Sequence, residues 1–77
     1  MFKITKDIIS DGDDVGITSH DYDGRELKHT FHLYDDDGEL YYYGKSDNQN
    51  FDPLDWAMGW AGCTEIRYFI NGKLETL

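Results

Sequence analysis

Carboxylates are the side chains of this sequence that could do chemistry, and they gather in short groups. The two main groups are Asp11, Asp13, Asp14, Asp21 and Asp23 in the amino-terminal third, and Asp35, Asp36, Asp37 and Glu39 around Gly38. Closely spaced carboxylates can bind calcium, act as an acid–base pair or attract a basic partner. An EF-hand needs carboxylates at its first, third and fifth positions, then Gly, then Glu at its twelfth, and neither group has that spacing. The sequence therefore predicts no metal site of this kind, and only weak cation binding at the turn from Asp35 to Glu39 stays open.

The cysteine and the histidines form no catalytic or metal-binding motif. Cys63 is expected just after a helix, where nothing local lowers the pKa of its thiol, and we predict that it is a buried packing residue. His29 and His32 are three residues apart on an expected strand, so their side chains point to opposite faces. The sequence also lacks a Gly-rich phosphate loop and a strand-to-helix elbow with a nucleophilic Ser. We predict a protein that is not an enzyme and uses no cofactor.

The carboxylates around Gly38 are predicted to lie at the tip of a β-hairpin. Aromatic and β-favouring residues flank the tip on both sides, and Gly38 can take the positive φ that closes a type I turn with a G1 bulge. This turn places Leu40 opposite Tyr34, and an unbroken register then follows along both strands. The predicted register puts one set of side chains on each face: Phe31, Leu33, Tyr41 and Tyr43 on the first, and Tyr34, Leu40 and Tyr42 on the second.

A short helix is predicted after this hairpin. Asp52 can cap it, Pro53 suits its first position, and Asp55 lies near its positive end. Gly62 is suited to the position just past its last residue, Ala61. Trp56 and Trp60 are four residues apart and are expected to share the face that covers the sheet.

The remaining segments complete an α+β fold. We expect a first strand over residues 2–9, a turn over 10–14, a short strand or irregular segment over 15–19, and a loop over 20–25. The hairpin strands are expected over 26–34 and 39–45, and a last hairpin joins 64–70 to 73–77 through Asn71-Gly72. The prediction is a single domain spanning residues 1–77: a small antiparallel sheet of four to five strands with one short helix, in the order β-β-β-α-β-β. Because both hairpins carry apolar residues on both faces, either the sheet curls into a partial barrel or some aromatic residues stay exposed for a partner.

The charge balance favours a basic partner. Sixteen acidic residues stand against seven basic ones in 77 residues, which gives a net charge of −9. Such a charge argues against direct binding to nucleic acid or to an anionic membrane. The alternative is that the acidity only keeps the protein in solution. A single cysteine and the absence of a signal-peptide pattern or a long apolar run predict a cytoplasmic location, and we expect a monomer.

A run of short motifs resembles a family of small acidic bacterial and prophage proteins. The motifs are Asp35-Asp36-Asp37-Gly38-Glu39, Tyr42-Tyr43-Gly44, Pro53-Leu54-Asp55, Ala61-Gly62-Cys63-Thr64 and Asn71-Gly72-Lys73. In size and acidity the chain is also similar to phage-encoded anti-CRISPR proteins and other DNA-mimic inhibitors. That similarity implies an inhibitor that occupies the basic nucleic-acid-binding channel of a host defence complex, such as a CRISPR effector.

The alternative is an accessory or antitoxin-like interaction module that binds a basic protein without blocking nucleic acid. In either case the carboxylates of the two acidic groups are the expected contact residues. Aromatic side chains would anchor the contact at short range, with Tyr34 and Tyr42 as the main candidates and the two Trp residues as further ones.

Overall fold

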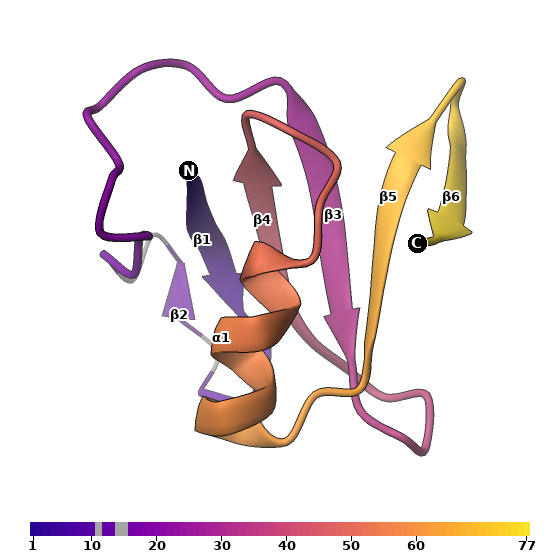
Figure 1. Ribbon diagram of the computed structural model, residues 1–77. Helices are drawn as coiled ribbons and strands as arrows, with labels where there is room; N and C mark the ends of the chain where they lie inside the picture. Colours follow the sequence, from indigo (N-terminus) through magenta and orange to yellow (C-terminus); the bar gives the residue numbers. More distant parts are fainter. Residues whose placement is uncertain (11, 14–15) are drawn as a thin grey trace.

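The protein folds as one antiparallel sheet with a single helix on one of its faces (Figure 1). The computed structural model describes residues 1–10, 12–13 and 16–77. The elements are β1 (Phe2–Asp7), β2 (Gly12–Asp13), β3 (His29–Tyr34), β4 (Leu40–Ser46), α1 (Asp52–Ala61), β5 (Glu65–Ile70) and β6 (Lys73–Thr76). Within the sheet the strand order is β2-β1-β4-β3-β5-β6. The predicted α+β class and the element order are confirmed, with β1, β3, β4, β5 and β6 as the five main strands and β2 as a two-residue addition at one edge.

The segment between β1 and β3 differs from the prediction in detail. The two residues of β2 lie inside the segment that was expected to be a turn. Over 15–19, where a short strand or an irregular segment was expected, the described residues are irregular apart from an isolated bridge between Thr18 and Lys3. The third strand begins at His29 rather than at residue 26, and the buried Leu27 belongs to the loop before it.

The central hairpin has the predicted turn but not the predicted register. Gly38 has φ 79°, its N–H donates to the Asp35 carbonyl over 3.1 Å, and Leu40 lies opposite Tyr34. Beyond that pair Tyr41 is an extra residue, so Leu33 faces Tyr42, His32 faces Tyr43 and Phe31 faces Gly44. The expectation that Tyr43 shares a face with Phe31 and Leu33 is therefore wrong, whereas Tyr41, the extra residue, still packs against the core that contains them.

Packing at Gly44 gives the physical reason for the shift. A Cβ atom at this position would lie 2.3 Å from Cζ of Phe31 and 2.6 Å from the carbonyl oxygen of Lys3. Only glycine leaves room for the Phe31 ring at the centre of the sheet. The one-residue bulge brings Gly44 opposite Phe31 and turns Tyr42 into the core.

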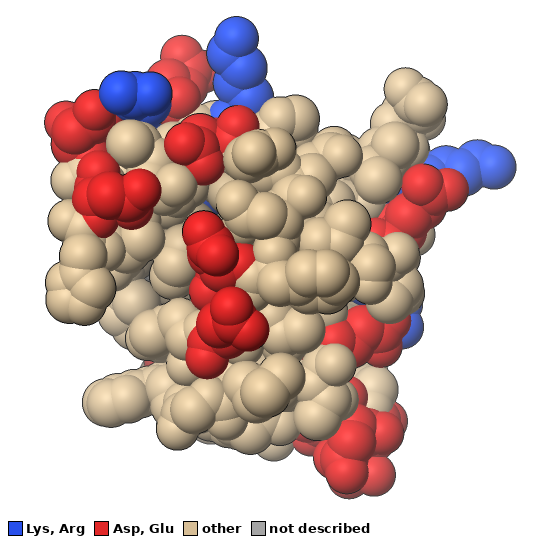
Figure 2. Space-filling model, viewed as in Figure 1, with Lys and Arg blue, Asp and Glu red and all other residues tan. Residues whose placement is uncertain are grey.

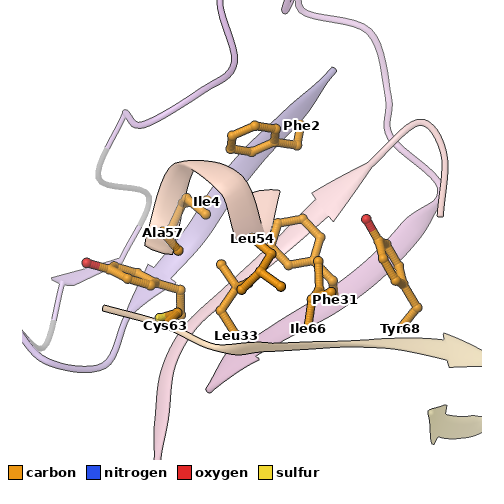
Figure 3. Close-up of a cluster of buried hydrophobic side chains, with 10 residues drawn as sticks. Phe2, Ile4, Phe31, Leu33, Leu54, Ala57, Cys63, Ile66 and Tyr68 are labelled. Atoms are coloured by element: carbon orange, nitrogen blue, oxygen red, sulfur yellow. The ribbon is translucent and has the colours of Figure 1, made fainter. Parts of the chain in front are cut away.

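The hydrophobic core lies between α1 and the sheet (Figure 3). Its buried members are Phe2, Ile4, Phe31, Leu33, Tyr42, Leu54, Ala57, Cys63, Ile66 and Tyr68. The buried hydroxyl of Tyr68 donates to the carbonyl of Asn50 over 2.8 Å, which ties the loop before the helix to β5. The prediction that Cys63 is buried is confirmed.

The ends of α1 follow the sequence only in part. The residue at the N-cap is Phe51, which makes no side-chain capping hydrogen bond, and Asp52 is already helical, so the predicted Asp52 cap is wrong. The side chain of Asn50 accepts the N–H of Asp52 over 3.1 Å and satisfies one of the free donors of the first turn. At the other end Gly62 takes the predicted left-handed conformation, with φ 73°.

The last hairpin agrees with the prediction. Ile70 faces Lys73, Phe69 faces Leu74 and Tyr68 faces Glu75. Positive φ angles of 53° at Asn71 and 81° at Gly72 fit the two-residue turn that this dipeptide favours.

Candidate functional site

The hairpin tip is a turn that one of its own carboxylates stabilises. Oδ1 of Asp35 accepts the N–H groups of Asp37 and Glu39, each over 2.9 Å. The hydrogen bond from the Glu39 N–H is the main reason that the pKa of Asp35 lies below its usual value. Carboxylate oxygens of Asp35, Asp36 and Asp37 lie within 4.8 Å of one another, so weak cation binding at this turn, which the sequence left open, stays open. Asp36, Asp37 and Glu39 are exposed and available to a partner.

The carboxylates of the amino-terminal group that the structure describes are engaged in local contacts. Asp21 accepts a hydrogen bond of 2.6 Å from the Ser19 hydroxyl and lies 3.5 Å from the terminal amine of Met1. Asp23 holds the guanidinium group of Arg25, with Nη2 2.8 Å from Oδ2. Asp11 and Asp14 lie outside the described residues, and Asp13 belongs to β2 with a side chain that the structure does not describe.

The two tyrosines that were proposed as aromatic anchors are both buried. Tyr42 is 3% exposed and packs in the core, where its ring centroid lies 5.2 Å from that of Trp56. Tyr34 is 9% exposed, and the guanidinium carbon of Arg67 lies 4.3 Å from the centroid of its ring. A partner would have to use other aromatic residues.

Trp60 is such a residue. It is 72% exposed, so the prediction that both Trp residues cover the sheet holds only for the half-buried Trp56. Met58 is 52% exposed and Phe51 is 50% exposed. Together with the exposed carboxylates of the first helical turn they form what we call the helix surface: Phe51, Asp52, Asp55, Met58 and Trp60.

The helix surface is apolar and acidic without a basic residue of its own. Two acidic residues lie in the first turn of α1, and its sequence contains no Lys or Arg. On the same side of the molecule carboxylates are spread in several groups, whereas Lys and Arg lie only toward the margins of the view (Figure 2). Because Trp56 and Trp60 are four residues apart, helical spacing alone does not separate them, and the exposure of Trp60 is set by how α1 packs on the sheet.

The opposite face of the sheet has a different composition. Directly paired residues share a face, which places Lys3, Lys45 and Thr30 on one row and Tyr43, His32 and Arg67 on the next. Phe69, two residues beyond Arg67 on β5, is 43% exposed. We call these seven residues the outer face: Lys3, Thr30, His32, Tyr43, Lys45, Arg67 and Phe69.

His32 lies at the centre of the outer face. Its ring centroid is 4.4 Å from that of Tyr43 and 5.5 Å from that of Phe69, and its Nδ1 is 3.2 Å from the hydroxyl of Tyr34. Burial, and then the charge of Arg67, hold the pKa of His32 below its usual value. The imidazole is therefore neutral at pH 7.

A groove of about 280 Å³ borders the outer face at the Lys3–Lys45 pair. Its other sides are lined by the loop before β3, which contributes Tyr22, Gly24, Arg25, the exposed carboxylate of Glu26 and the buried Leu27. Within the described part of the chain no carboxylate lies within ion-pair distance of either lysine. Two like charges directly opposite each other on neighbouring strands are unfavourable by themselves, so this end of the face is suited to an anion.

Cys63 has the properties of a packing residue. Its side chain is fully buried, and burial raises the pKa of the thiol to about 11. A thiol with such a pKa is not a nucleophile at neutral pH.

Along the described residues α1 is the only helix, and it is too short to cross a membrane. Comparison with protein-family models, with curated proteins and with solved structures gives no match to this chain.

Proposed function

We propose that this protein is a non-enzymatic interaction protein that binds a basic protein partner through the helix surface. The observation that carries the proposal is the 72% exposure of Trp60; Met58 and Phe51, which lie on another side of the helix, are also exposed. Tryptophan is among the residues that most often dominate binding energy, and its burial removes on the order of 150 to 250 Å² from water. An exposed tryptophan on the surface of a small acidic domain is suited to a partner.

The charges of the helix surface supply the selectivity for a basic partner. Asp52 and Asp55 flank the apolar side chains, and the whole protein has a net charge of −9. Long-range attraction of this kind speeds association, while a buried aromatic anchor slows dissociation. Asp36, Asp37 and Glu39 at the hairpin tip extend the acidic surface.

The finer form of the proposal concerns the kind of partner. Proteins that hold nucleic acid line their channels with Lys and Arg, and a folded acidic surface can occupy such a channel. We extend the proposal to a phage or prophage inhibitor that blocks the nucleic-acid channel of a host defence complex, such as a CRISPR effector. The size and acidity of the chain support this form, and the alternative is an interaction module that leaves the channel free.

The partner can be identified by crosslinking at the helix surface. A photoreactive phenylalanine analogue at position 60 should capture the partner from a host lysate, whereas the same group at position 43, on the outer face, should not. The captured protein is then purified and its binding measured directly. Displacement of the bound inhibitor by DNA supports the channel-blocking form, and a stable ternary complex supports the alternative.

Two sets of variants test how the contact works. Trp60→Ala should raise the dissociation rate at least about tenfold, because it removes the proposed anchor. The double variant Asp36→Asn with Asp37→Asn should mainly lower the association rate, and its binding should depend less steeply on salt. Phe69→Ala, an exposed aromatic residue on the opposite side of the sheet, is the matched control. Binding that Trp60→Ala leaves unchanged would remove the helix surface from the contact.

A further inference from the structure

The outer face combines unpaired lysines with half-exposed rings. Glu65 lies two residues from Arg67 on β5, and Arg67 already binds it over 2.7 Å. Lys3 and Lys45 lie side by side without a carboxylate partner among the described residues, and Arg25 lines the groove beside them. This end of the face therefore presents positive charge in a protein whose net charge is −9.

The rings lie next to these charges. Tyr43 is two residues from Lys45 on β4, so both side chains are on one face about 7 Å apart along the strand. Tyr43, His32 and Phe69 come from the three adjacent strands β4, β3 and β5, and their rings are in mutual contact through His32. Because His32 is neutral at pH 7, it adds a ring rather than a charge.

We propose that the outer face binds single-stranded nucleic acid. Positive residues that hold the backbone, next to aromatic rings on which bases stack, are the two parts that such sites combine. The groove formed by Lys3, Lys45 and Arg25 holds phosphates, with Tyr22 as a further wall. Tyr43, His32 and Phe69 hold the bases.

The net charge of the protein does not rule this out. At about 0.15 M ionic strength, exposed charges more than about 8 Å apart are largely screened from each other. Asp52 and Asp55 are on α1, which covers the other face of the sheet (Figure 1). Glu26 lines the groove as well, so that Lys3, Lys45 and Arg25 outnumber the carboxylates of the lining by three to one; nearby, Asp23 pairs with Arg25, and Asp47 lies 2.8 Å from the terminal amine of Met1. The present proposal departs from the expectation, drawn from the acidic balance of the sequence, that nucleic acid is not bound directly, because basic side chains gather at one end of this face.

This site is separate from the one in the proposed function. The helix surface and the outer face are on opposite sides of the sheet, so each can be altered without the other.

The test uses the full chain and a fluorescein-labelled thymidine oligonucleotide of about 10 nucleotides, within the range that one small domain covers. Fluorescence anisotropy at about 0.05 M salt gives the affinity, and amide chemical shifts locate the contact. We expect saturable binding, with amide chemical-shift changes at residues of β3, β4 and β5 and no such changes at residues of α1. Phe69→Ala should weaken binding at least about fivefold, whereas the matched control Trp60→Ala should not.

The contribution of the lysine charges to oligonucleotide binding is tested with the same anisotropy measurement. Lys45→Gln should weaken binding severalfold, while Lys73→Gln, which removes an exposed charge from the start of β6, should have no effect. A polyglutamate peptide is the third probe. If polyglutamate binds with the same affinity as the oligonucleotide and causes no chemical-shift changes at His32, Tyr43 and Phe69, the outer face binds an acidic protein. That result would overturn the proposal. It would also be overturned by an absence of oligonucleotide binding, or by shifts confined to α1.

Discussion

At the scale of single residues, Gly44 shows how one position decides which side chains enter the core. Its Cα is so close to the Phe31 ring and to the backbone of β1 that a methyl group has no room. The carbonyl oxygen of Lys3, which a Cβ at this position would approach to 2.6 Å, is part of the backbone and cannot rotate away.

We therefore expect Gly44→Ala to destabilise the protein by about 1 to 3 kcal/mol or more, as overpacking of a core does. The control is Gly59→Ala, because a Cβ there meets no atom within 4 Å and lies inside α1. That change should stabilise the protein by up to about 1 kcal/mol through higher helix propensity. Urea unfolding of both variants measures the difference, and equal midpoints would show that Gly44 is not sterically required.

His32 makes stability depend on pH. Its pKa in the folded protein is below the ordinary value of 6.5, because burial and the Arg67 charge disfavour the imidazolium ion. Between these two pKa values the unfolded chain binds more protons than the folded one. This contribution to stability is therefore complete above pH 6.5 and is lost as the pH falls toward the pKa of the folded state.

The variant His32→Gln isolates this contribution from that of the carboxylates. As the pH is lowered from about 7.5 to about 5.5, the urea midpoint of the wild type should fall relative to that of the variant. Parallel pH profiles for the two proteins would contradict this account.

At the scale of elements, the stability of the hairpin tip depends on the carboxylate of Asp35 and not on those of Asp36 and Asp37. Asp35 accepts two backbone N–H groups, whereas Asp36 and Asp37 only extend into solvent. Asp35→Ala should therefore lower the urea midpoint, and Asp36→Ala with Asp37→Ala should leave it close to that of the wild type. Asp35→Asn should retain most of the stability, because an amide oxygen accepts the same two hydrogen bonds. If all three variants unfold alike, the side chain of Asp35 does not stabilise the turn.

At the scale of the whole molecule, the charge imbalance opposes folding. A net charge of −9 within one small domain repels itself, and salt screens that repulsion. The ion pairs Arg25–Asp23 and Arg67–Glu65 are partly exposed and lose little when salt is added.

We expect the urea midpoint to rise when NaCl is increased from about 0.01 to about 0.5 M. CaCl₂ at the same ionic strength is the comparison. If the urea midpoint rises equally in the two salts, screening alone explains the effect. If it rises more in CaCl₂, and the double variant Asp36→Ala with Asp37→Ala abolishes the difference, a cation binds at the hairpin tip. A midpoint that falls with NaCl would show that ion pairs outweigh the repulsion.

The sequence by itself determined the elements and most of their ends. The Asn71-Gly72 turn, the Gly38 turn and the Gly62 helix end depend on φ angles and hydrogen bonds within a few residues, which neighbouring side chains decide. The class of the fold and the order of its elements followed from these signals.

Only the tertiary structure decided which side chains face inward. The bulge at Tyr41 arises because Phe31 requires a glycine opposite it, and that contact joins two different strands. One extra residue then moves every side chain beyond it to the other face, so Tyr42 enters the core and Tyr43 joins the outer face. Trp60 is exposed because Leu54 and Ala57 occupy the space between α1 and the sheet. Both candidate surfaces follow from packing between segments that are distant in the sequence, and local patterns do not contain that information.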